Sequence, residues 1–259
     1  MDKEKFVPYL KELAQKYAVA GQLEAELLPG AVSIQSEQGS ERFVYDFAAT
    51  GAPGQTPLLH WRSKRRYIEL RNILEQKLVQ TPLALRIHHI VPQDEFAQTL
   101  QDIFAYEADL AEFITGQPIQ RVFADFSGGE YTNCILSTKG GIKVSMELGF
   151  SPAGSQPVLL HEVVAKTGVI SDVAVDTQTQ QHSLYVFSGP ETHTYTDADS
   201  ELYGLENTQA DCIRFILWAL EQPQRIPRLQ AQARHLQAVW QAAEQASKNA
   251  AYTVVEAEA

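Results

Sequence analysis

The stretch that decides the fold begins at Asp102, reads DIFAYEADLAEFITG as far as Gly116, and continues through strand-like segments to Val175. Apolar residues at helical spacing predict a helix over 94–115, and Gly116 follows it as a stop. Short runs of apolar residues with turn sequences between them come next. The stretch therefore predicts a helix packed on an antiparallel sheet.

Tight turns join the strands of this predicted sheet. Ser127-Gly128-Gly129 and Lys139-Gly140-Gly141 supply the positive φ that short hairpins need, and Lys166-Thr167-Gly168 and Gly189-Pro190 act similarly. Successive strands joined in this way are expected to be antiparallel neighbours. The predicted strands are 118–126, 131–138, 142–150, 157–166, 169–176, 182–187 and 192–196.

The remaining elements complete an α+β fold with a large, mostly antiparallel sheet and helices on one face. The predicted helices are 3–19, 61–79, one capped by Asn207 and ended by Pro223, and 228–248; the further strands are 31–36, 42–47, 83–91 and an edge strand at 253–255. Gly and Pro residues in 51–57 mark the best boundary. We therefore expect an N-terminal segment, 1–57, and a main domain, 58–259.

Composition and charge exclude several classes of function. The chain has 259 residues, a formal net charge of −11 and a pI of about 5.1. This charge argues against nucleic-acid binding and against binding to an anionic membrane, because both require a positive field. The sequence shows neither an apolar run of about 20 residues nor a signal peptide, so we expect a cytoplasmic protein. Cys134 and Cys212 are expected to be inert core thiols.

Both faces of the predicted sheet carry apolar residues. In strand 169–175, Val169, Val173 and Val175 lie on one side and Ile170 on the other. Helices are expected to cover one face. A second sheet from another copy would cover the other face, which predicts a homo-oligomer.

Four segments resemble a known family in their order and spacing. They are Arg62–Leu74, Asp109–Gly116, Val163–Ile170 and Asp211–Val255, the last with Pro227 between two helices. Together they resemble the C-terminal domain of the Gfo/Idh/MocA oxidoreductases. The resemblance implies that residues 58–259 form the α+β domain that follows a Rossmann domain in that family.

The departures from the family pattern concern its chemistry. The chain contains no Gly-x-Gly for a dinucleotide, only about sixty residues precede the matching part, and there is no Lys-Pro segment. In the family's Asp-x-x-x-His element the aspartate is kept as Asp102, but Tyr106 replaces the histidine that acts as general base. A tyrosine with a pKa of about 10 is a poor base at neutral pH. The resemblance thus implies no catalytic residue and no cofactor in this chain alone.

Two groups of residues are candidates for ligand binding. Asp102 and Tyr106 lie one helical turn apart, so they could line a remnant pocket for a polyol or sugar, or be one exposed acid and one packed aromatic residue. Arg62, Lys64, Arg65 and Arg66 form a dense basic cluster at a helix start. They could bind an anionic ligand or an acidic partner, or simply be solvated.

The histidines suggest no metal site. His88 and His89 are adjacent in a strand and point to opposite faces, so they cannot bind one metal together. We expect all seven to be structural or surface residues. The other five are isolated in the sequence: His60, His161, His182, His193 and His235.

Four readings are compatible with this sequence. The first is an accessory, oxidoreductase-like protein that acts through oligomerisation, with itself or with a full-length relative as the partner chain. The second is the substrate-binding subunit of a split NAD(P)-dependent sugar or polyol dehydrogenase, in which a partner chain supplies the Rossmann domain. The third is a sensor of a sugar-like ligand, and the fourth is a globular α+β protein of unrelated function.

Overall fold

The computed structural model describes residues 3–19, 23–36, 39–45, 54–93, 99–172, 183–188, 191–196, 205 and 207–256. Its contacts divide the chain into two compact units. Unit 1 comprises Met1–Lys64 and Ala198–His235, and unit 2 comprises Arg65–Asp197 and Leu236–Ala259. The domain boundary expected after residue 57 stays a prediction.

Unit 1 contains a small sheet and helices. The sheet has the order β1-β2-β3-β4, with β4 parallel to β3. Its apolar core includes Phe6, Leu10, Ile34, Phe43 and Trp61. The elements are α1 (Lys3–Lys16), β1 (Glu24–Leu28), β2 (Ala31–Ser36), β3 (Gly39–Val44), β4 (Gln55–Pro57), η2 (His60–Ser63), α4 (Asn207–Glu221) and the first part of α5 (Arg225–Asn249).

Unit 2 is built on a nine-stranded sheet in the order β12-β11-β10-β9-β5-β8-β7-β6-β13. All its pairs are antiparallel except β5 with β8. The predicted α+β class is confirmed. The strands are β5 (Pro82–Pro92), β6 (Ile119–Ser127), β7 (Tyr131–Thr138), β8 (Lys143–Ser151), β9 (Val158–Ala165), β10 (Gly168–Ser171), β11 (Ser183–Ser188), β12 (Glu191–Thr196) and β13 (Thr253–Val254).

The position of β5 corrects the expectation that all successive strands are neighbours. β8 and β9 do not pair with each other, because β5 lies between them, parallel to β8 and antiparallel to β9. The connection from β8 to β9 includes Pro152 and Gly154 and is longer than a tight hairpin. This length allows the chain to step over one strand. The turn at Gly128 and Gly129 has the expected positive φ, 64° and 77°.

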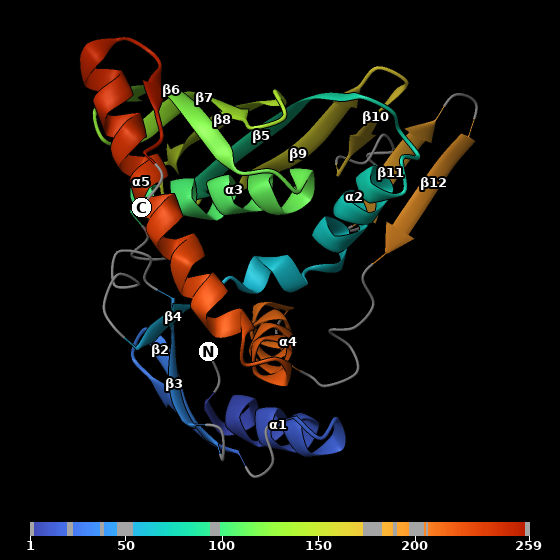
Figure 1. Ribbon diagram of the computed structural model, residues 1–259, viewed down its shortest axis with the longest axis vertical. Coiled ribbons are helices and arrows are strands. Elements are labelled where there is room, and N and C mark those ends of the chain that lie inside the picture. The colour runs from blue at the N-terminus through green and yellow to red at the C-terminus, as the bar shows by residue number, and fades with distance from the viewer. Residues whose placement is uncertain are drawn as a thin grey trace. The chain divides into compact units, whose positions relative to one another are not determined.

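Helices cover one face of the nine-stranded sheet, which we call the inner face (Figure 1). The helix α3 (Leu100–Thr115) packs on β5 and β8, and α2 (Arg65–Glu75) packs on α3. Trp240, in the second part of α5, contacts Phe104 of α3 and Phe126 of β6. The inner face is apolar because alternate strand residues point towards these helices. Buried examples are Leu85, Ile87, Leu136, Val144 and Met146.

Two predicted helices have different bounds in the structure. The segment expected as one helix over 61–79 is the 3-10 turn η2 followed by α2, with the extended residue Lys64 between them. α5 begins at Arg225, so Pro227 lies in its first turn, where its missing N–H costs little. Residues 94–98, Val173 and Val175 lie outside the described part. No helix among the described residues is long and apolar enough to cross a membrane.

Candidate functional site

The helix α3 carries the candidate residues Asp102 and Tyr106, and both of its ends are fixed locally. Thr99 and Asp102 form a capping box: Asp102 Oδ2 accepts from Thr99 N at 2.9 Å, and Thr99 Oγ1 accepts from Asp102 N at 3.2 Å. At the other end Gly116 has φ 67°, the left-handed C-cap conformation that glycine adopts without strain. Asp102 is therefore occupied in holding the helix N-terminus.

Tyr106 contacts side chains of α2 and β5. Its hydroxyl lies 3.1 Å from the hydroxyl of Tyr67 in α2, and its ring packs edge to face on His89 with centroids 5.4 Å apart. Burial raises the pKa of Tyr106 well above its usual value. The phenol is thus neutral at physiological pH and can donate one hydrogen bond.

The predicted basic cluster spans the boundary between the two units. Arg62 and Lys64 belong to unit 1, and Arg65 and Arg66 begin α2 in unit 2. Arg66 reaches the region of Tyr106, because its guanidinium stacks on Tyr67 at 4.7 Å from the ring centroid. Its Nη1 also lies 3.9 Å from Asp172 Oδ2. Arg66 therefore links the two predicted groups of site residues.

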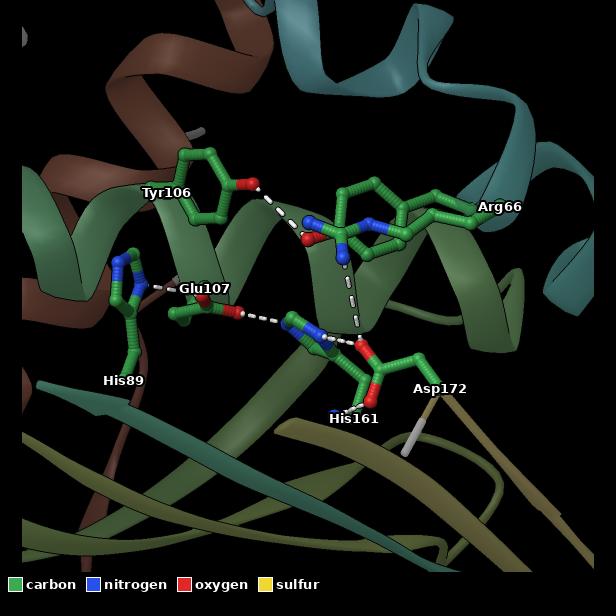
Figure 2. Close-up of polar contacts among 7 residues, drawn as sticks. Arg66, His89, Tyr106, Glu107, His161 and Asp172 are labelled. Carbon is green, nitrogen blue, oxygen red and sulfur yellow. Dashed lines mark hydrogen bonds and ion pairs between the residues drawn. The ribbon is translucent and has the colours of Figure 1, made fainter. Parts of the chain in front are cut away.

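A buried polar chain that the sequence did not reveal lies below Tyr106 and Arg66 in the view of Figure 2. Glu107 Oε1 lies 2.6 Å from His89 Nδ1, and Glu107 Oε2 lies 2.9 Å from His161 Nε2. The other nitrogen of His161, Nδ1, lies 2.8 Å from Asp172 Oδ2. We call His89, Glu107, His161 and Asp172 the inner polar chain. Its members come from β5, α3, β9 and the residue after β10.

The hydrogen bonds of the inner polar chain define its charges. Both nitrogens of His161 face carboxylate oxygens, so both must carry protons and the ring is an imidazolium. Burial alone would lower the pKa of His161, but the charges of Glu107 and Asp172 and the hydrogen bonds to them raise it to about 9. Burial alone would raise the pKa of Glu107, but the His161 charge and hydrogen bonds from both histidines lower it to about 2.

His161 is further supported by Tyr67, whose ring meets it edge to face with centroids 4.9 Å apart. His161, Glu107 and Tyr67 have no exposed side-chain surface. A buried ion pair is stable only when its remaining polar atoms are also satisfied, and Asp172 and His89 supply these partners. These contacts hold β5 and β9 to Glu107 of α3.

His161, which is isolated in the sequence, lies close to His89 in the folded chain. In the pairing of β5 with β9, Ile87 lies opposite His161, so His161 and His89 are diagonal neighbours on the inner face. That pairing could not be read from the sequence. Glu107 could have been recognised, because it lies on the same helical face as the buried residues Ile103, Leu110 and Ile114.

Other predicted features are placed as follows. His88 and His89 point to opposite faces as expected: His88 pairs with Glu147 and His89 with Glu107. Cys134 and Cys212 are buried, and burial raises the pKa of each thiol to about 12, as expected for inert core cysteines. Within the described ranges no group of three or more His, Cys, Asp or Glu side chains could hold a metal ion.

Comparison with solved structures finds the same fold in several oxidoreductases. No family model and no curated protein sequence matches the chain. An oxidoreductase domain protein from Kribbella flavida has a TM-score of 0.60 at 14% identity over 81% of this chain and 68% of that protein. Levoglucosan dehydrogenase in complex with NADH and levoglucosan has a TM-score of 0.64 at 12% identity over 77% of this chain and 66% of that protein.

A third solved structure shows that the fold is not restricted to enzymes. The transcriptional regulator Gal80p from Kluyveromyces lactis has a TM-score of 0.62 at 12% identity over 78% of this chain and 62% of that protein. This chain shares the fold of these proteins. It spans about two thirds of their length. They are the neighbours that the resemblance to the Gfo/Idh/MocA oxidoreductases predicts, and at these identities they establish the fold alone.

Proposed function

We propose that this chain is an accessory, oxidoreductase-like protein that acts by assembling through the outer face of its nine-stranded sheet, with a second copy as the partner. The observation that carries this proposal is the composition of that face. Half-buried or exposed apolar residues alternate there with charged ones. The apolar residues are Ile90, Phe123, Tyr131, Ile135, Val158, Leu160, Val164 and Val169.

The charge of the outer face favours a second copy over another partner. On strands β5 to β9, whose side chains are described, the register places three cations there, Arg86, Arg121 and Lys143, and three anions, Asp125, Glu147 and Glu162. This part of the face is therefore balanced in charge, whereas the chain carries −11. Two copies that meet at this face avoid the repulsion that their net charges would otherwise produce.

The size of the outer face also suits a stable dimer. Its five central strands, spaced by about 4.8 Å and about eight residues long at roughly 3.3 Å each, cover roughly 24 by 26 Å, or about 600 Å². Side-chain relief increases this towards the ~800 Å² per partner of a standard interface. Tyr131 is 36% exposed and Val158 is 43% exposed, so apolar area is available for burial.

An accessory role without dehydrogenase activity is supported by Tyr106. By the resemblance to the Gfo/Idh/MocA oxidoreductases it stands at the position of the catalytic histidine, and burial holds the pKa of its phenol far above neutrality. It therefore does not accept a proton from an alcohol at physiological pH. A split dehydrogenase remains a distinct outcome: it predicts hydride transfer with NAD or NADP only when a Rossmann-containing partner chain is added.

Sedimentation velocity over a concentration series tests the assembly. We expect a dimer, and we expect Leu160→Asp in β9, on the outer face, to raise the dissociation constant at least about tenfold, because roughly 1.4 kcal/mol or more is lost when a charge is buried there. Leu78→Asp is the matched control, since Leu78 is 49% exposed and lies after α2. A monodisperse monomer at micromolar concentration would contradict the proposal.

A second candidate function, binding of a sugar- or polyol-like molecule, is favoured by the partly exposed groups near Tyr106. Arg66 and His89 keep 20% and 16% of their side-chain surface exposed, and both lie beside a tyrosine ring. Levoglucosan, L-sorbose and myo-inositol are suitable probes, because structurally similar dehydrogenases carry these names or ligands. We expect one of them to raise the melting temperature of the wild type but not of Tyr106→Ala. No shift with any probe would contradict this candidate.

A further inference from the structure

His89 differs from His161 within the same polar chain. His161 is fully buried and both of its nitrogens are paired with carboxylates. His89 keeps 16% of its side chain exposed, and its Nδ1 faces Glu107 at 2.6 Å. Within the part of the chain that the structure describes, no hydrogen bond is found to His89 Nε2. A purely structural histidine at this place would be expected to satisfy both nitrogens, as His161 does.

The inner polar chain determines which nitrogen of His89 carries the proton. Glu107 is ionised, because it is bonded to the His161 imidazolium, and an ionised carboxylate only accepts hydrogen bonds. His89 Nδ1 must therefore donate to Glu107 Oε1. In the neutral ring the lone pair is then on Nε2, the nitrogen on the far side of the ring from Glu107 (Figure 2). Glu107 thus positions an imidazole with an open acceptor next to Tyr106.

Charge limits the kind of ligand that this acceptor can bind. An anion is disfavoured, because a lone pair on Nε2 offers it no proton. An ammonium group is disfavoured as well, because Arg66 and the His161 imidazolium are already balanced by Asp172 and Glu107, so a further cation would have no counter-charge. A neutral alcohol can donate to Nε2 without adding charge, and its oxygen can accept in turn.

We infer that His89 Nε2 is the hydrogen-bond acceptor for a hydroxyl group of a sugar- or polyol-like ligand, with Glu107 as the residue that positions it. This inference rests on the second candidate function above and assigns a residue to it. The residue that accepts the hydrogen bond from the ligand hydroxyl is then His89 in β5, and not Tyr106 in α3. The two side chains are already in ring contact, so one hydroxylated molecule can reach both.

Modification by diethyl pyrocarbonate tests the open nitrogen directly, since the reagent acylates unprotonated imidazole. With peptide mapping by mass spectrometry, we expect His89 to react and His161 to remain unmodified in the folded protein. At a probe concentration about twice its dissociation constant, levoglucosan, L-sorbose or myo-inositol is expected to slow modification of His89 roughly threefold. Equal reactivity of His89 and His161 would overturn the inference.

Two substitutions test the roles of the two His89 nitrogens separately. His89→Asn can keep the donor to Glu107 but removes the acceptor, so affinity for the bound probe should fall about tenfold. His89→Gln can place a carbonyl oxygen near the former Nε2 and should keep affinity within about threefold. His88→Asn, on the outer face, is the control and should not change binding.

The outcomes distinguish the inference from the function on which it depends. Wild-type affinity in His89→Asn, with the probe still bound, would overturn the role of His89 and leave ligand binding intact. If none of the three probes protects His89 or stabilises the wild type, ligand binding itself fails and the inference fails with it. Assembly through the outer face is measured separately and is unaffected by either result.

Discussion

Two adjacent residues of β5, His88 and His89, each pair with a glutamate, but on opposite faces of the same sheet. On the inner face His89 and Glu107 lie 2.6 Å apart, with 16% and 0% of their side chains exposed. On the outer face His88 and Glu147 lie 3.8 Å apart, with 41% and 46% exposed. The same residue types at the same level of one strand therefore occupy very different dielectric environments.

The difference shows that burial increases the contribution of a polar contact to the stability of the fold. Water can replace either partner of the outer pair, so its net contribution to stability is expected to be small. The inner pair belongs to the inner polar chain. Its carboxylates are removed from water, so their charges are stabilised only by their hydrogen-bond partners. Glu107 contacts two histidines, and no part of its side chain is exposed to take up water instead.

The largest predicted effect is loss of Glu107. Glu107→Ala leaves the His161 imidazolium buried with one nitrogen unpaired, which should lower the free energy of unfolding by about 3–5 kcal/mol. Glu147→Ala is the matched control on the outer face and, at protein concentrations well below the dissociation constant of the dimer, should change it by less than about 0.5 kcal/mol. Urea unfolding of both variants measures the difference. Equal losses in the free energy of unfolding for the two variants would contradict this difference between the inner and outer faces.

The next effect is the pH dependence of stability. The pKa of His161 is raised from 6.5 to about 9, so its contribution is fully present below about pH 6.5 and is lost as the pH rises through 9. The loss between these values is on the order of 3 kcal/mol for this buried group. The pKa of Glu107 is lowered from 4.5 to about 2, so its contribution is present above pH 4.5 and is lost as the pH falls through 2.

Unfolding measured at several values between pH 4.5 and pH 9.5 tests this window. We expect the inner polar chain to contribute most between about pH 4.5 and pH 6.5, with stability declining above that range. His88→Ala should leave the shape of the profile unchanged. A wild-type profile that is flat from pH 6.5 to pH 9.5 would mean that His161 is not held as an imidazolium.

Local sequence signals were sufficient for most of the fold. Alternation and glycine turns predicted strands β6, β7 and β8, because a hairpin depends on residues that are close in sequence. The predicted helix ending at Gly116 is confirmed for the same reason, since a C-cap is decided within one turn. The predicted α+β class followed from these elements.

The inner polar chain was not predictable in the same way. It requires β5 to insert between β8 and β9, and the residue spacing from His89 to His161 carries no sign of that pairing. Of the predicted site residues, Tyr106 and Arg66 both contact Tyr67, which lies in the segment predicted as a helix over 61–79. Contacts of this kind depend on tertiary packing, which no local pattern encodes.

A smaller effect is expected at the N-terminus of α3, which carries Glu107 onto the inner face. Asp102→Ala removes the capping box with Thr99, which should reduce stability by about 1 kcal/mol. Asp102→Asn, which can still accept from Thr99, should recover much of this loss. If Asp102→Ala instead destabilises the fold as strongly as Glu107→Ala, the position of α3 depends on the capping box at its N-terminus and not on the inner polar chain.

The smallest effect is expected for the outer pair Arg86 and Glu162, which lie 2.8 Å apart with 62% and 24% of their side chains exposed. In the monomer, at protein concentrations well below the dissociation constant, Arg86→Ala should lower the free energy of unfolding by less than about 0.5 kcal/mol. Raising the protein concentration should enlarge this effect, because assembly through the outer face removes the pair from water and couples unfolding to dissociation. A loss above about 1 kcal/mol at dilution would contradict the assignment of the pair to an open face. If the loss of unfolding free energy does not change with protein concentration, the pair lies outside the proposed interface.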